Sequence, residues 1–164
     1  MLLDLREIID VPGASLPFAF DIDLSGLESG SVVKIGVPAR VEGKIDNEAG
    51  MILLTGVLTA DTTCVCARCL KEFGRHVELP LRASLAEEIQ DETECDAYLI
   101  VGGSADVDEI ARTAFVLNTE QRLLCREDCR GLCPTCGKDL NEGPCSCREA
   151  QDPRLAVLGQ LLEK

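Results

Sequence analysis

The chain has 164 residues, of which 46% are hydrophobic and 27% are charged, a composition that argues against intrinsic disorder and favours a globular protein. Aromatic residues make up only 3%, which disfavours a surface on which nucleic-acid bases stack. Acidic residues outnumber basic ones by 29 to 16, and the net charge of −13 disfavours a protein that binds nucleic acid through its overall charge.

The first half of the chain has the two-residue periodicity of β-strands. We expect a turn at residues 46–50 and strands over residues 16–24, 33–45, 52–60, 73–85 and 98–101. The short connections favour an antiparallel meander or a half-closed barrel.

The sequence also predicts two helices. Residues 86–96 form an acidic loop, and Asp106 with Glu109 then makes a capping-box-like start for a helix over residues 107–118. A short C-terminal helix with an apolar leucine stripe is expected to begin after Asp152. The expected fold class is therefore α+β, with a packing helix on the sheet.

Cysteine is unusually frequent in this chain, which contains ten. Cysteine-rich chains are either secreted and disulfide-bonded or intracellular and metal-binding. Residues 1–7 lack the basic and apolar segments of a signal peptide, and no apolar run reaches the length of a membrane span. We therefore expect a cytoplasmic protein with no membrane partner, whose reduced thiols bind metal.

Four cysteines near the C-terminus follow the pattern C-x2-C-x8-C-x-C: Cys133, Cys136, Cys145 and Cys147. Pro134 favours the tight turn that lets the first pair grip one ion. Gly137 permits a left-handed backbone whose N–H groups bond the sulfurs. Four thiolates suit a closed tetrahedral site, so we expect structural zinc.

Four more cysteines can complete a second site: Cys66, Cys69, Cys125 and Cys129. The spacing leaves two pairings open. The Cys66/Cys69 pair joins either the Cys125/Cys129 pair, which would tie the tail onto the sheet, or the Cys133/Cys136 pair, as in a two-knuckle zinc ribbon. Cys64 is expected as a small buried hydrophobe and Cys95 as a bystander.

These positions divide the chain into a β-rich domain with one helix, residues 1–121, and a cysteine-rich, zinc-ribbon-like module with a C-terminal helix, residues 122–164. Basic residues flank the cysteines and are candidates for binding RNA or a protein partner: Arg68, Lys71, Arg126, Arg130, Lys138 and Arg148. The alternative is a solvated surface of mixed charge, because each four-thiolate zinc site carries a charge of about −2.

The sequence contains no motif of a hydrolase, a P-loop or a dinucleotide-binding protein, and we predict no catalytic residue and no small-molecule substrate. His76 is the single histidine, so no multi-histidine zinc hydrolase site can form, and we expect it on the surface. The acidic residues 87–96 are expected to be a solvated loop, which leaves metal-dependent nuclease activity poorly supported.

Several of these motifs resemble the YceD-like family. The resemblance is carried by Cys66-Ala-Arg-Cys69-Leu70 after a strand, by the cysteine, glycine, leucine and asparagine positions of residues 125–141, and by Cys145-x-Cys147 followed by Asp152-Pro153-Arg154. It implies a cytoplasmic bacterial protein, often encoded beside a ribosomal-protein gene and associated with accumulation and processing of large-subunit ribosomal RNA. It implies no catalytic residues.

Two functions remain as hypotheses. The first is a non-enzymatic zinc-binding factor in ribosome biogenesis, whose partner is a ribosomal RNA precursor or a ribosomal or processing protein, and whose zinc contributes folding energy. The alternative is a redox-sensitive zinc–thiol switch or holdase chaperone, which releases its metal when its thiols are oxidised.

Overall fold

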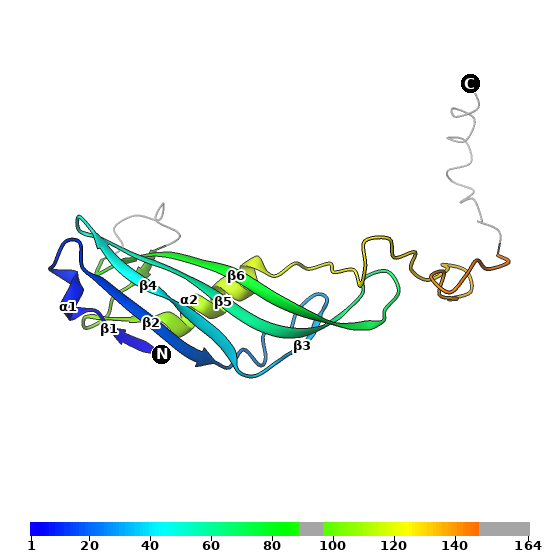
Figure 1. Ribbon diagram of the computed structural model, residues 1–164, viewed down its shortest axis with the longest axis horizontal. Coiled ribbons are helices and arrows are strands. Elements are labelled where there is room, and N and C mark those ends of the chain that lie inside the picture. The colour runs from blue at the N-terminus through cyan, green and yellow to red at the C-terminus, as the bar shows by residue number, and fades with distance from the viewer. Residues whose placement is uncertain (89–96, 148–164) are drawn as a thin grey trace, which may run out of the picture.

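The computed structural model describes residues 1–88 and 97–147. Its centre is a six-stranded sheet, in the order β2 (Ser15–Ile22), β4 (Ala39–Glu48), β5 (Met51–Val65), β6 (Glu72–Ala86) and β7 (Ala97–Leu99), while β3 (Val32–Ile35) pairs with β5. Figure 1 shows a long twisted sheet with the C-terminal cysteine segment at one end. The predicted α+β fold is confirmed, whereas the predicted C-terminal helix and most of the acidic loop lie outside the described residues.

The hairpin of β5 and β6 is the longest feature of the sheet. Its ladder runs without a register shift from Ile52 opposite Leu85 to Val65 opposite Glu72. β5 extends beyond the predicted residues 52–60 because Thr62, Thr63 and Val65, which are residue types that favour strands, continue it, whereas β6 exceeds the predicted residues 73–85 by one residue at each end. This length carries the connecting loop, with its two cysteines, to the far end of the sheet.

The prediction of one continuous strand over residues 33–45 is wrong. β3 ends at Ile35 and β4 begins at Ala39, with Pro38 between them. Proline has no N–H to donate to a ladder, so the strand is interrupted there. The predicted turn at residues 46–50 is also shorter, because only Ala49 and Gly50 leave the ladder, both with positive φ.

Three further features were not predicted. β7 lies parallel to β6, so the sheet is not wholly antiparallel, because residues 87–96 are a longer connection than a hairpin turn. β1 (Leu2–Asp4) and β8 (Ser104–Asp106) pair in a separate two-stranded sheet. The short helix α1 (Arg6–Ile9) is held to β4 by buried Asn47, whose side-chain amide donates to the carbonyls of Ile8 and Ile9 at 2.8 and 2.7 Å.

Helix α2 (Val107–Asn118) has the predicted bounds. The Asp106 carboxylate caps it by accepting from the N–H of Asp108 at 3.1 Å. Its apolar stripe, including Ile110 and Phe115, is buried against the inner face of the sheet, along which it lies in Figure 1. After the C-terminal end of α2, the chain runs toward the end of the sheet where the β5–β6 loop lies.

Candidate metal centres

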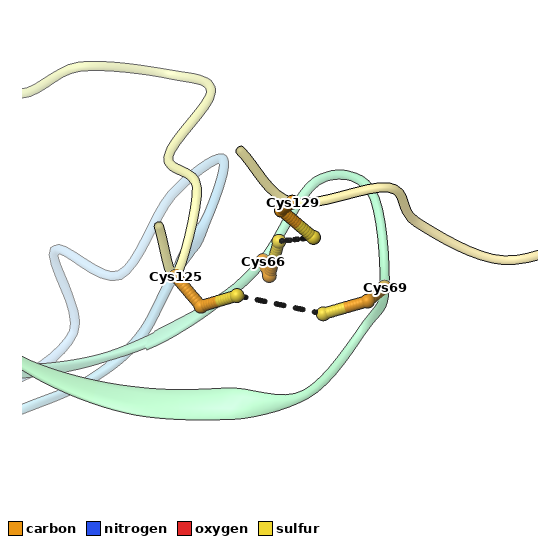
Figure 2. Close-up of side chains that lie close together, drawn as sticks. All are labelled: Cys66, Cys69, Cys125 and Cys129. Atoms are coloured by element: carbon orange, nitrogen blue, oxygen red, sulfur yellow. Dashed lines mark hydrogen bonds between the residues drawn. The ribbon is translucent and has the colours of Figure 1, made fainter. Parts of the chain in front are cut away.

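The first cysteine cluster joins two distant parts of the chain. Cys66 and Cys69 lie in the β5–β6 loop, and Cys125 and Cys129 lie beyond α2; their four sulfurs are all within 4.8 Å of one another. The Cys66 and Cys129 sulfurs are 3.7 Å apart, as are those of Cys69 and Cys125 (Figure 2). Of the two pairings that the sequence leaves open, the structure brings together the one that ties the tail to the sheet.

Backbone contacts explain how Cys125 reaches the loop. The N–H of Ala67 donates to the carbonyl of Leu123 at 2.8 Å. The hydroxyl of Ser31, just before β3, accepts from the N–H of Leu123 at 3.1 Å and donates to the carbonyl of Gln121 at 3.2 Å. These bonds hold the chain after α2 between β3 and the β5–β6 loop, two residues before Cys125.

Apolar side chains enclose this first cluster. Phe73, Leu124 and Leu132 pack against the buried cysteines, so that Cys66 is fully buried and Cys129 is 1% exposed. The cluster thus has a small hydrophobic core of its own, which Phe73 connects to the core between α2 and the sheet.

The second cluster forms within a single short segment. The sulfurs of Cys133, Cys136, Cys145 and Cys147 also lie within 4.8 Å of one another. Cys136 is exposed and both Cys145 and Cys147 are partly exposed. The four residues that the C-x2-C-x8-C-x-C pattern predicted to act together are therefore brought together, but nearer to solvent than the first four.

The two Cys-x2-Cys turns have the same backbone hydrogen bonds. The N–H of Leu70 donates to the carbonyl of Cys66 at 3.0 Å, and the N–H of Gly137 donates to the carbonyl of Cys133 at 2.9 Å. Leu70 and Gly137 both have positive φ, +58° and +72°. Glycine adopts this conformation freely, whereas leucine is destabilised there by about 1 kcal/mol.

Each cluster contains one thiol that ionises easily and one that resists ionisation. Burial raises the pKa of Cys66, but backbone N–H groups, chiefly that of Cys125, outweigh it and lower the pKa to about 6. Burial and the neighbouring sulfurs raise the pKa of Cys125 to about 12. In the second cluster, backbone N–H groups lower the pKa of Cys133 to about 6, while the Cys136 sulfur and burial raise that of Cys147 to about 12.

Both donor sets fit a divalent metal ion. Zinc–sulfur bonds of about 2.3 Å place the sulfurs of a tetrahedral site about 3.8 Å apart, close to the 3.7 Å of both sulfur pairs in the first cluster. A cation also removes the repulsion between thiolates that holds the last thiol protonated. Four sulfur ligands suit zinc or iron and leave no open coordination position.

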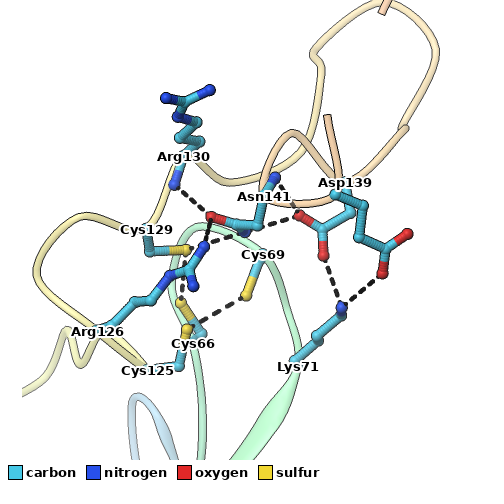
Figure 3. Close-up of polar contacts among 10 residues, drawn as sticks. Cys66, Cys69, Lys71, Cys125, Arg126, Cys129, Arg130, Asp139 and Asn141 are labelled. Atoms are coloured by element: carbon cyan, nitrogen blue, oxygen red, sulfur yellow. Dashed lines mark hydrogen bonds and ion pairs between the residues drawn. The ribbon is translucent and has the colours of Figure 1, made fainter. Parts of the chain in front are cut away.

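Asn141, which lies between Cys136 and Cys145 of the second cluster in the chain, bonds to Cys129 of the first cluster (Figure 3). Its side-chain oxygen accepts from the Arg130 N–H and from the Arg126 guanidinium, both at 2.8 Å. Its side-chain nitrogen donates to Asp139 at 2.7 Å and to the Cys129 sulfur at 3.5 Å. Sequence reasoning counted Asn141 among the positions that resemble the family but gave it no role.

Lys71 makes a second connection between the β5–β6 loop and the cysteine segment. Its ammonium group lies 2.8 Å from the Asp139 carboxylate and 3.0 Å from that of Glu142. The lysine lowers the pKa of Asp139 to about 2, and the two carboxylates raise that of Lys71. The cysteine segment can approach the β5–β6 loop closely because residue 131 is glycine: a Cβ atom there would lie 2.8 Å from the carbonyl oxygen of Arg68.

Five of the six basic residues predicted to bind RNA or a partner lie exposed around the clusters, and Arg148 lies outside the described residues. Four of the five bond within the chain. Besides the Lys71 and Arg126 contacts, Arg68 donates to the Cys129 carbonyl at 2.8 Å and Lys138 to the Pro144 carbonyl at 2.9 Å. In the described parts of the chain, only the Arg130 side chain of this set has no such contact.

Two other predictions concern residues outside the clusters. His76 is exposed, as predicted, and its ring nitrogen lies 2.7 Å from the Asp61 carboxylate. Cys64 is buried in the main core, also as predicted, whereas Cys95 is outside the described residues. Among the described helices, none has the length and apolar character needed to cross a membrane.

A family model for the large ribosomal RNA subunit accumulation protein YceD matches residues 54–162. The chain belongs to the YceD family. The match begins within β5 and includes all eight cysteines of the two clusters. The N-terminal strands up to β4 precede the matched range.

Relatives of this YceD-family chain occur in mycobacteria. Uncharacterized proteins of Mycobacterium bovis and Mycobacterium tuberculosis are 29% identical over 99% of the chain and 81% of their own length. An uncharacterized protein of Mycobacterium leprae is 30% identical over 80% of the chain and 62% of its own length. No solved structure matches the chain significantly.

Proposed function

We propose that this YceD-family protein is a non-enzymatic factor in ribosome biogenesis that supports the processing and accumulation of large-subunit ribosomal RNA in the cytoplasm. The observation that carries the proposal is that the matched family range contains two complete four-cysteine clusters. Four protein ligands satisfy a tetrahedral ion, so the metal would stabilise the fold and leave no position for a substrate.

The metal we propose is zinc, one ion in each cluster. Cys66, Cys69, Cys125 and Cys129 would hold the first ion, and Cys133, Cys136, Cys145 and Cys147 the second. When bound, zinc would supply a cross-link between segments and neutralise part of the thiolate charge. In this proposal residues 1–121 and residues 122–164 are two units, and the first cluster joins them.

The metal proposal is tested by elemental analysis of the full chain, purified without chelators. We expect two zinc ions per chain and no iron. One zinc ion, or iron in place of zinc, would contradict the assignment. The biological proposal is tested in a strain that lacks the gene, in which mature large-subunit ribosomal RNA should fall relative to small-subunit RNA and recover when the gene is restored. An unchanged ribosome profile would contradict it.

A redox-sensitive switch or holdase is the second candidate, favoured by the exposure of Cys136 and the partial exposure of Cys145 and Cys147. In this reading, hydrogen peroxide oxidises two thiolates of the second cluster to a disulfide, is itself reduced to water, and the ion is released. Peroxide titration with a zinc-sensitive dye tests it. Zinc release accompanied by a disulfide would support a switch, and zinc retention while ordinary exposed thiols are oxidised would rule it out.

A further inference from the structure

The loop between β5 and β6 exposes a leucine where the backbone favours glycine. Leu70 follows the second cysteine of its Cys-x2-Cys turn with a φ of +58°, and its side chain is 64% exposed. Gly137 occupies the matching position of the other turn, with the same hydrogen bond and a φ of +72°. The first turn therefore carries an apolar side chain that neither its backbone conformation nor the protein core requires.

Most cations around the first cluster are already engaged within the chain, which disfavours RNA at Leu70; of the described basic residues discussed above, Arg130 alone keeps a side chain without such a contact. The neighbouring ammonium group of Lys71 is already paired with Asp139 and Glu142, two carboxylates for one cation. The Arg68 guanidinium donates to the Cys129 carbonyl. RNA is bound by free cations at its phosphates and by aromatic side chains at its bases, and leucine supplies neither. Single exposed leucines are common on protein surfaces, but Leu70 is held at a positive φ where the matching turn has glycine, and an apolar contact with another protein would offset that strain.

The net charge of the chain indicates what kind of partner protein Leu70 would contact. The chain carries a net charge of −13, and two four-thiolate zinc sites would each add about −2 in place of neutral thiols. Such a protein attracts a basic surface and repels an acidic one. We propose that Leu70 inserts into an apolar pocket on a basic protein of the large ribosomal subunit or its precursors. This inference rests on the proposed function and chooses between its two classes of partner.

The variant Leu70→Gly separates this role from folding. Glycine fits the backbone at this position, so metal content and thermal stability should be retained while the side chain is lost. Binding of the full chain to large-subunit particles purified from a strain lacking the gene should weaken about tenfold or more. Met51→Ala is the matched control, because Met51 is also exposed, at 62%, and is the first residue of β5, at the end opposite the β5–β6 loop.

A photo-crosslinking amino acid at position 70 identifies the contact directly, with the same amino acid at position 51 as control. Using the same particles, we expect at position 70 an adduct that protease removes, ribonuclease does not, and mass spectrometry assigns to a basic protein. An adduct with RNA, with an acidic protein or with residues 148–164 of this chain would overturn the inference, as would the absence of an adduct or full binding by Leu70→Gly. A normal ribosome profile in the deletion strain would instead remove the proposed function itself.

Discussion

The side-chain amide of Asn141 donates a hydrogen bond to the sulfur of Cys129, 3.5 Å away, and so joins the segment of the second cluster to a ligand position of the first. The same side chain bonds Asp139, which is paired with Lys71 at the start of β6. The cysteine segment is thus attached to the sheet by a continuous set of polar contacts in addition to the first cluster. Amide hydrogen bonds to a sulfur also stabilise the negative charge that a metal ligand needs.

Replacing Asn141 by alanine should loosen this attachment. We expect the variant Asn141→Ala to lose about 1–2 kcal/mol of unfolding free energy, because the part-buried Cys129 sulfur and Asp139 carboxylate lose a hydrogen-bond donor. Metal release from the first cluster to a chelator should be faster. Asn118→Ala is the control, since the exposed side chain of Asn118 bonds, within the described residues, the Ala114 carbonyl of its own helix and no residue of either cluster. Equal release rates in the two variants would contradict the role of Asn141.

Single cysteine substitutions should remove one metal ion each. Cys66→Ser should lose the ion of the first cluster and free residues 125–129 from the β5–β6 loop, since that cluster draws its ligands from both segments. Cys133→Ser should lose only the second ion and leave the sheet intact. Elemental analysis and amide hydrogen exchange measure both effects. Cys64→Ser is the control for metal content, and a lost ion there would show that the clusters are wrongly assigned.

The metal-free protein should titrate in separated steps. Because the pKa values of Cys66 and Cys133 are lowered to about 6, these two thiols are thiolates above that pH and thiols below it. The thiols of Cys125 and Cys147 should stay protonated until about pH 12. The ultraviolet absorbance of thiolate measures these steps. Cys133→Ser should remove about half of the first step, and a single transition near pH 8.5, the value for free thiols, would contradict both clusters.

Substitutions at residues 70 and 137, the matching positions of the two Cys-x2-Cys turns, should affect the unfolding free energy differently. Gly137→Ala should lower the unfolding free energy by about 1 kcal/mol, because alanine is strained at positive φ. Leu70→Gly should leave it unchanged or raise it by up to about 1 kcal/mol, because that strain is relieved and little apolar contact is lost. Thermal unfolding at fixed zinc concentration compares the two. A loss of stability in Leu70→Gly would show that the leucine packs within the fold.

Much of the fold follows from local sequence pattern. Helix α2 and its cap at Asp106 were predicted with their bounds because hydrophobic period and capping are properties of one short segment. β2, β5 and β6 follow from alternation in the same way. The break at Pro38 was a local signal that the alternation of apolar residues masked, since proline has no N–H for a ladder. The parallel pairing of β7 was not predicted because strand direction depends on partners that are distant in sequence.

The amino-acid sequence by itself determined the composition of the second cluster, because its four cysteines are close enough in the chain to fold around one point. Only the tertiary structure decided which pair meets Cys66 and Cys69, since that depends on the length of the β5–β6 hairpin and on where α2 releases the chain. Pairing between segments that are dozens of residues apart is a property of the packed sheet and helix, and no local spacing encodes it.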